Sequence, residues 1–270
     1  MPNALDQLRE ELVIANRILT HEGIVDAFGH VSARHPTDPG RFLISRHRAP
    51  ELVEPGDLLE FTLDYKPVTP TAFRLYSEGI IHGAIYAARP DVHAVCHHHS
   101  PAVLPFCISG TELVPVYHLG AAMGPKVPFW DQQDEFGDTT LLVVKPEEGR
   151  SLARALGNNW TVLMRRHGAT VAGASIRELV FRTVYGCANA EMQWKAQMQG
   201  HVSQLTSGEA TMSGSHSTRP IPMERAWDFW ERRLRRAGGY PADARPKTAR
   251  AKDSARRKSN KTVKRSSKRS

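Results

Sequence analysis

The sequence predicts an α/β domain in which short strands alternate with helices. Segments with apolar residues at three- and four-residue spacing, as on one face of a helix, are separated by short apolar and β-branched runs. Of the 270 residues, 40% are hydrophobic and 24% charged, which is typical of a globular protein with a substantial core. No run approaches the roughly 18 consecutive apolar residues that a membrane helix needs. We therefore expect one domain of about 205–210 residues and no membrane span.

The first half of the chain is expected to contain two long helices. Residues 5–22 have the spacing of an amphipathic helix, which ends at Gly23. Residues 72–89 contain no proline and carry a stripe of small and apolar side chains. We therefore expect a helix here that stops before Pro90. Short runs bounded by turn residues predict the strands of this half at 28–36, 41–45, 58–64 and 94–99.

The second half continues the alternation. Residues 161–173 (TVLMRRHGATVAG) indicate a strand or hairpin broken at Gly168, because glycine interrupts an otherwise regular strand pattern. A long helix is expected at 176–199 and a last one at 226–236. The remaining expected elements are a short helix within 100–108, a strand at 139–145 and a short helix at 151–158.

The excess positive charge lies in a C-terminal tail. The formal net charge is +8, but twelve Lys or Arg and one Asp fall in residues 245–270, so the preceding 244 residues carry −3. A tail of this composition cannot bury a core, and it has no aromatic residue to stack on bases. We therefore expect a solvated appendage without nucleic-acid binding. The chain is divided into a domain, 1–210, a C-terminal extension with a helix, 211–244, and a disordered basic tail, 245–270.

The cysteines and the N-terminus favour a cytoplasmic location. The three cysteines, Cys96, Cys107 and Cys187, are too few and too scattered for a disulfide framework, and none forms a Cys-x-x-Cys pair. The N-terminal residues include acids where a signal peptide has a basic flank. A cysteine-based zinc site is therefore not expected.

Histidines are the most informative residues of this sequence. Alternate side chains of a strand share a face, so His97 and His99 point together and His98 points away. His167, at the end of a strand and next to Gly168, is the best candidate for a third metal ligand. Three protein imidazoles leave coordination positions for water or substrate, as in catalytic sites. A buried histidine is more often a hydrogen-bonded core residue than a metal ligand, so spacing alone leaves both interpretations open.

The run SEGIIHGAIYAARPDVHAVCHHHSP resembles the signature of the class II aldolase/adducin superfamily. Further similarity in FGHVSAR and LMRRHGATVAG extends the resemblance over residues 5–200. It implies a three-layer αβα fold with a mostly antiparallel central sheet. It also implies a homotetramer with active sites at subunit interfaces and one divalent metal ion per subunit, Zn²⁺ or Mn²⁺. In that family a helix acid, a His-x-His strand and a later His-Gly supply the ligands, here Glu78, His97, His99 and His167.

Departures from the sugar-phosphate aldolases favour the decarboxylase branch of this family. The Gly-Asn pair and the Thr-Gly stretch of the aldolase phosphate cradle correspond here to Gly29-His30 and to SRHRAP, residues 45–50. A phosphate suits backbone N–H groups and small hydroxyls, whereas a carboxylate suits the guanidinium fork. The pattern resembles hydroxy-methylpyridine-dicarboxylate and dihydroxyphthalate decarboxylases. The resemblance thereby implies substrate binding by His30, Ser45, Arg46, Arg48, Tyr76 and Ser77.

The resemblance thus predicts a metal-dependent carbon–carbon lyase that decarboxylates a hydroxylated pyridine or benzene dicarboxylate. The metal would stabilise an enolate or phenolate, and Glu78 or His118 would deliver the proton. His118 occupies the place of a catalytic tyrosine in fuculose-phosphate aldolases, although a loop residue without a role is an equal alternative. Two other functions stay open: an aldolase acting on a sugar phosphate or 2-oxo acid, and a non-catalytic binding protein that acts through the basic tail.

Overall fold

Seven strands form one sheet in residues 3–241, the part of the chain that the structure, a computed structural model, describes. The strands are β1 (His30–Arg34), β2 (Arg41–Ser45), β3 (Leu58–Thr62), β4 (Ala94–His98), β5 (Phe129–Trp130), β6 (Thr161–Met164) and β7 (Gly168–Gly173). Their order is β3-β2-β1-β4-β7-β6-β5. Neighbouring strands are antiparallel except β5 and β6, which are parallel. The expected basic tail, 245–270, lies outside the described residues.

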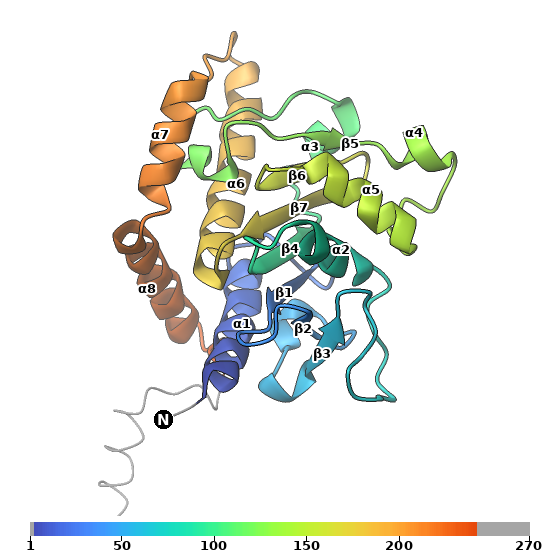
Figure 1. Ribbon diagram of the computed structural model, residues 1–270. Coiled ribbons are helices and arrows are strands. Elements are labelled where there is room, and N and C mark those ends of the chain that lie inside the picture. Colours follow the sequence, from blue (N-terminus) through green and yellow to red (C-terminus); the bar gives the residue numbers. More distant parts are fainter. Residues whose placement is uncertain (1–2, 242–270) are drawn as a thin grey trace, which may run out of the picture.

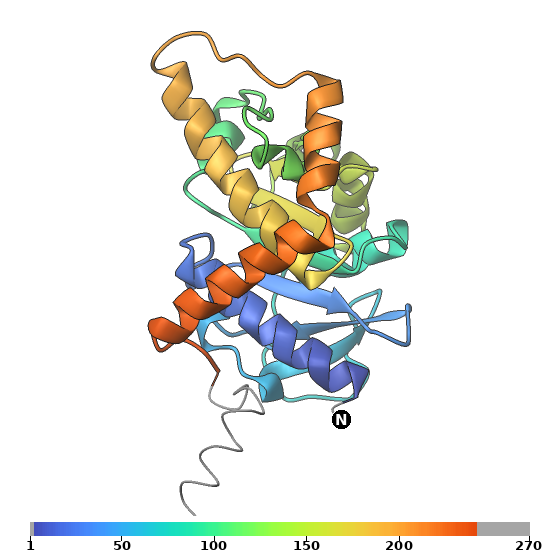
Figure 2. The same ribbon diagram turned by 90° about the vertical axis from the view of Figure 1, so that its left-hand side faces the viewer.

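Helices cover both faces of this sheet (Figure 1). One face packs against α1 (Ala4–His21), α6 (Ile176–Gln197) and α8 (Pro220–Arg236), which lie side by side in Figure 2, and the other against α2 (Ile80–Ala88) and α5 (Pro146–Leu156). Consecutive strand residues contribute to opposite cores: Leu163 belongs to the first, Val162 and Met164 to the second. The three-layer αβα fold with a mostly antiparallel sheet is confirmed. None of the helices in residues 3–241 combines the length and hydropathy of a membrane span.

The predicted helix at 72–89 was wrong in its first half, because α2 begins only at Ile80. Residues 72–79 instead form an irregular segment that packs on the loop after β2. The His47 N–H donates to the Arg74 carbonyl at 2.8 Å, and the Tyr76 hydroxyl bonds to Ser45 and to the Arg48 carbonyl. These contacts with a distant loop give the segment's polar groups partners outside a helix.

The predicted strand at 139–145 was also wrong, because its backbone donors have carboxylate partners. The Val143 N–H donates to Glu78 Oε1 at 2.9 Å, and the next two N–H groups along the chain donate to Glu148 Oε2 at 2.8 and 2.9 Å. The sheet instead ends with the two-residue strand β5. The β-like composition of 139–145 therefore reflects burial of Val143 and not membership in the sheet.

Two helices, α5 and α8, begin earlier than the predicted helices at 151–158 and 226–236. Pro146 and Pro220 begin α5 and α8, because the first turn of a helix tolerates proline. The helix α7 (Ser207–Ser217) was not expected, since its Ser- and Gly-rich sequence has low helix propensity. A capping box at its start and packing on the 3₁₀ turn 120–123 stabilise it. The division of the chain at residue 210 stays a prediction.

Short helical elements complete the described chain. The hairpin β6–β7 turns just before Gly168, as predicted, and the cysteines are buried free thiols. The remaining elements are α3 (Leu104–Ser109), α4 (Gln132–Phe136) and 3₁₀ turns at Pro50–Leu52, Pro55–Asp57 and Gly120–Met123.

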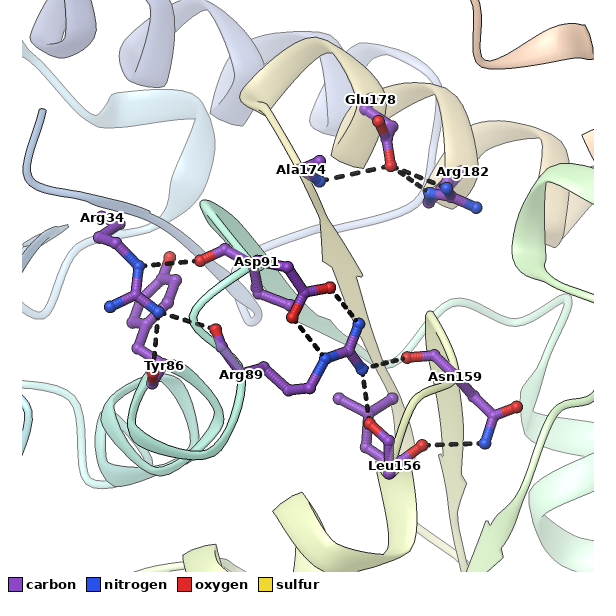
Figure 3. A network of polar contacts seen from close by, with 11 residues as sticks. Arg34, Tyr86, Arg89, Asp91, Leu156, Asn159, Ala174, Glu178 and Arg182 are labelled. Atoms are coloured by element: carbon purple, nitrogen blue, oxygen red, sulfur yellow. Dashed lines mark hydrogen bonds and ion pairs between the residues drawn. The ribbon is translucent and has the colours of Figure 1, made fainter. Parts of the chain in front are cut away.

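Buried arginines fasten β1 to the C-terminal end of α2 (Figure 3). Arg34 donates to the carbonyl oxygens of Tyr86 at 2.8 Å and Arg89 at 2.9 Å. Arg89 in turn forms two bonds with the Asp91 carboxylate, at 2.8 and 2.7 Å. The last carbonyls of a helix have no partner within it, so Arg34 both satisfies them and fixes α2 against the sheet.

Candidate metal centre

Three histidines and one glutamate meet at one end of β4. One nitrogen or oxygen from each of Glu78, His97, His99 and His167 lies within 4.8 Å of those of the others. His97 Nε2 and His99 Nε2 are 2.9 Å apart, and Glu78 Oε2 lies 3.6 Å from His167 Nε2 and 3.8 Å from His97 Nε2. The structure therefore brings together the four residues for which the sequence predicted metal binding.

Strand alternation and a tight hairpin place the three histidines. His97 lies on β4 and His99 just beyond its end, whereas the ring of His98 lies outside the cluster, where its Nδ1 accepts from the Ser100 N–H at 3.3 Å. His167 lies in the β6–β7 turn, and the following Gly168 comes very close to β4: an added Cβ would lie 2.3 Å from the His98 carbonyl oxygen. Only glycine permits this approach without displacing the strand.

Hydrogen bonds orient two of the four side chains. Glu78, just before α2, accepts the Val143 N–H through Oε1, which leaves Oε2 toward the histidines. His97 Nδ1 lies 3.2 Å from Thr170 Oγ1 on the neighbouring strand β7, and its Nε2 faces the cluster. Metal-binding histidines commonly coordinate the metal through one ring nitrogen, while a hydrogen bond at the other ring nitrogen fixes the orientation of the ring. No sequence pattern indicated these roles of Val143 and Thr170.

The surroundings of the His167 ring indicate whether these residues fit a metal ion. Both of its ring nitrogens are buried and have no hydrogen-bond partner among residues 3–241. Such atoms lose their hydration without compensation, which costs about 1–3 kcal/mol each. A cation bound by Nε2 satisfies one of them, and a set of three imidazoles with a carboxylate is typical of Zn²⁺ and other divalent transition metals. The residues therefore fit a divalent cation.

Burial keeps the rings in the form that binds metals. Desolvation lowers the pKa of His97 well below its ordinary value, and the neighbouring histidines, led by His167, lower it further. The pKa of His99 is lowered for the same two reasons. Neutral imidazole has the lone pair that coordinates a cation, so His97 and His99 do not have to release protons to accept one near neutral pH.

One predicted substrate-binding residue, His30, adjoins the cluster, and Tyr76 and then Ser45 follow it outward. The His30 ring centroid lies 5.2 Å from that of His97 and 4.8 Å from that of Tyr76. The Tyr76 hydroxyl lies 3.0 Å from Ser45 Oγ. The fourth, Ser77, precedes Glu78 and is exposed.

Arg46 and Arg48 share one buried carboxylate that the sequence did not indicate. Arg46 Nε lies 2.6 Å from Asp57 Oδ1, and Arg48 Nη1 lies 3.1 Å from Asp57 Oδ2. Side chains of the two arginines are 29% and 32% exposed, so each guanidinium has other N–H groups accessible to a ligand. Asp57 therefore orders the pair and neutralises part of its charge.

His118 does not join the cluster within one chain. It is exposed and lines two surface cavities of about 590 and 510 Å³. The other lining residues belong mainly to α6, α7 and α8, and none is a cluster residue. A separate cavity of about 850 Å³ reaches His99 between residues 23–28 and 49–52, and the exposed side chains of Phe28 and Leu52 line it.

Comparisons with known proteins assign the family. Residues 10–194 match the family model described as class II aldolase and adducin N-terminal domain. The chain belongs to this family. Among class II aldolase relatives, decarboxylase tropJ of Talaromyces stipitatus is 32% identical over 247 residues, covering 83% of this chain and 92% of tropJ. The 3,4-dihydroxyphthalate decarboxylase of Arthrobacter keyseri is 26% identical over 191 residues, covering 65% and 73% of the two chains.

Solved structures share the class II aldolase fold. An aldolase II superfamily protein from Pseudomonas syringae superposes with a TM-score of 0.74 at 22% identity, covering 89% of this chain and 96% of that one. L-fuculose 1-phosphate aldolase from Glaciozyma antarctica PI12 gives 0.72 at 21% identity, covering 88% and 92%. These similarities show the fold, and the sequence relatives support a lyase.

Proposed function

We propose that this protein is a metal-dependent lyase that decarboxylates a hydroxylated aromatic dicarboxylate. The observation that carries the proposal is the buried His167, whose ring nitrogens have no hydrogen-bond partner within the described part of the chain although His97, His99 and Glu78 lie close by. The two relatives named above as decarboxylases favour a carboxy-lyase over an aldehyde-lyase. The substrate of one of them, a dihydroxyphthalate, carries a hydroxylated ring and two carboxylates.

A bound divalent cation, Zn²⁺ or Mn²⁺, supplies Lewis acidity that stabilises an enolate or phenolate. His97, His99 and His167 would hold it, with Glu78 as a further ligand in the resting site. During the reaction the ring carbon–carboxylate bond breaks, its electron pair stays on the ring carbon, and a proton adds there as carbon dioxide leaves. Glu78 can deliver this proton when it is protonated at Oε2 and not bound to the cation, because the Val143 N–H holds Oε1 while Oε2 faces the cluster.

The second carboxylate of the substrate binds at the side of the cluster occupied by His30. Arg46 and Arg48 supply guanidinium N–H groups, and Tyr76 and Ser45 supply hydroxyls. Asp57 holds the two arginines in place but lowers their net charge, so this subsite suits one carboxylate better than a phosphate dianion. Ser77 stays a candidate contact on geometric grounds, since it is exposed beside Glu78.

A homotetramer gives His118 a role. In one chain His118 lies on a surface formed with α7 and α8, apart from the cluster. In the family arrangement, where active sites lie between subunits, it reaches the metal centre of a neighbouring copy and is the alternative proton donor to Glu78. Variants Glu78→Gln and His118→Gln, compared at equal metal content, distinguish the two, because the proton donor is the one whose loss reduces kcat most.

A paired product assay tests the proposal. The protein loaded with Mn²⁺ or Zn²⁺ is incubated with 3,4-dihydroxyphthalate and, separately, with fuculose 1-phosphate. We expect carbon dioxide release from the first and no aldehyde from the second, and we expect carbon dioxide release to stop after metal removal. Aldehyde release without carbon dioxide release would assign an aldolase, and turnover that persists without metal would exclude the metal mechanism.

A further inference from the structure

A buried chain of hydrogen bonds connects Tyr86 on α2 with His30 beside the metal cluster. The Tyr86 hydroxyl lies 2.8 Å from Ser32 Oγ, which lies 2.6 Å from His82 Nδ1. His82 Nε2 is in turn 2.6 Å from His30 Nδ1. All four side chains are at most 4% exposed. None of the three residues beyond His30 contacts the four candidate metal ligands through a hydrogen bond among the described residues.

The Tyr86 hydroxyl determines the direction of this chain. Among residues 3–241, Ser32 Oγ is the one side-chain partner of this hydroxyl, and its oxygen also accepts a backbone hydrogen bond from Val95, so the phenol must donate its hydrogen to Ser32 or leave it unpaired. An unpaired buried donor costs about 1–3 kcal/mol. Because Tyr86 uses its own hydrogen for this bond, His82 Nδ1 is the one side-chain acceptor left for the Ser32 hydrogen among residues 3–241, and Ser32 donates to it. A neutral His82 then carries its hydrogen on Nε2 and donates it to His30 Nδ1.

This order of donors fixes the tautomer of His30. Because Nδ1 accepts, the single hydrogen of the neutral ring lies on Nε2. That nitrogen has no hydrogen bond within the described residues and is not fully buried, so it can meet a ligand. The ring also adjoins His97, at 5.2 Å between centroids. An Nε2–H cannot coordinate a cation, which explains why a fourth imidazole can lie beside the metal ligands without being one.

We propose that Tyr86, Ser32 and His82 are positioning residues that present His30 as an uncharged Nε2–H donor to a substrate carboxylate oxygen. The identity of the acceptor rests on the proposed function, whereas the direction of the hydrogen-bond chain does not. In the opposite tautomer, an Nε2 lone pair would repel the carboxylate and compete for the metal ion. This relay, the hydrogen-bonded series Tyr86, Ser32, His82 and His30, therefore excludes the His30 tautomer that would weaken both carboxylate binding and metal binding.

Arg34 holds the distal end of this relay in place (Figure 3). It lies on β1 two residues after Ser32, donates to the Tyr86 carbonyl at 2.8 Å, and places its guanidinium 4.8 Å from the centre of the Tyr86 ring. Ring and backbone of Tyr86 are thus both fixed relative to β1. The hydroxyl consequently has little freedom to find another acceptor.

Nitrogen NMR of the full-length, Zn²⁺-loaded protein labelled with ¹⁵N in histidine tests the relay without relying on turnover. The His30 and His82 signals are assigned by their loss in His30→Gln and His82→Gln. We expect both rings in the Nε2–H tautomer, and we expect Tyr86→Phe to convert these signals to a mixture of tautomers. Tyr240→Phe, a change at a tyrosine that packs on Arg235, is the matched control and leaves the signals unchanged. An Nδ1–H tautomer of His30, or no effect of Tyr86→Phe, overturns the relay.

Substrate binding tests the donor role separately. His30→Ala is expected to raise the KM for a dicarboxylate substrate at least tenfold, because a hydrogen bond to a charged group is lost. Metal content, measured by elemental analysis, is expected to stay unchanged. If KM stays the same while NMR shows the predicted tautomer, His30 is not a substrate donor. If no dicarboxylate is turned over, the proposed function fails, and the NMR result still decides the relay.

Discussion

A side chain at position 168 has no room in this fold. An added Cβ would lie 2.3 Å from the His98 carbonyl oxygen and 2.9 Å from His99 Cδ2. Because His98 ends β4 and His99 follows it directly, any accommodation moves candidate metal ligands. Packing and site geometry therefore depend on the same glycine.

Gly168→Ala is expected to destabilise the protein by about 1–3 kcal/mol and to reduce bound metal. Thermal unfolding and metal content measured on the same sample check both effects. Gly56→Ala is the control, because no atom lies within 4 Å of its added Cβ. A Gly168→Ala protein with wild-type stability and full metal content would contradict the close approach.

Substitution of single histidines on and beside β4 provides a second test. His97→Ala is expected to lose bound metal on elemental analysis, since its Nε2 faces the cluster. His93→Ala, an exposed histidine next to the same strand, and His98→Ala, whose ring lies outside the cluster, are expected to retain it. Retention by His97→Ala with loss in His98→Ala would mean that the other face of β4 binds the metal.

Which residues the sequence predicted depends on how local their determinants are. Strand alternation and a recognisable motif were enough for His97, His99 and His167. Asp57, Val143 and His82 were not predicted, because their importance arises from contacts with segments far along the chain. A turn aspartate or a strand-like valine has no sequence pattern that indicates its tertiary partner.

At the scale of elements, Glu148 connects the start of α5 to the segment before it. Its Oε2 accepts the N–H groups of Val144 and Lys145, and the adjacent Val143 N–H binds Glu78. The carboxylate thus satisfies donors at the helix start and orders the segment that orients Glu78. An acidic side chain in the first helical turn also interacts favourably with the helix dipole.

Glu148→Ala is expected to lower the free energy of unfolding by about 0.5–2 kcal/mol, as loss of a helix cap does. Denaturant unfolding measures the change, and metal affinity is expected to fall with it. Glu147→Ala, at the exposed neighbouring position in the same turn, is the matched control. Equal stability of the two variants would argue against the capping role.

The expected elements were correct where periodicity and packing agree. The helix at 5–22 and the hairpin at 161–173 correspond to α1 and to β6–β7. Residues 72–79 and 139–145 were assigned to a helix and a strand because their composition suits those structures. Their backbone groups instead bind a loop and two carboxylates, which a local pattern does not reveal.

At the scale of the whole molecule, metal binding and stability are coupled. A ligand that binds the folded chain alone raises the free energy of unfolding, by roughly 2.7 kcal/mol at a concentration of 100 Kd. Removal of metal with a chelator is therefore expected to lower the Tm, and Zn²⁺ or Mn²⁺ to restore it. In His97→Ala the Tm is expected to be insensitive to both treatments. A metal-induced increase in that variant would place the binding elsewhere.

The basic tail is expected to be dispensable for catalysis. A chain that ends at Ala244 lacks the twelve basic residues of 245–270 but retains every proposed site residue. Metal content, oligomeric mass by light scattering and turnover are expected to equal those of the full chain. Loss of turnover with mass and metal content unchanged would assign the tail a function.

The bond between Glu78 and the Val143 amide has a practical consequence. That amide is buried, outside the sheet, and its acceptor is a candidate metal ligand. Its rate of hydrogen–deuterium exchange therefore reports on how firmly Glu78 is held. Binding of a cation should slow exchange at this one position more than in the strands, so Val143 can serve as an internal gauge of metal occupancy that requires no substrate.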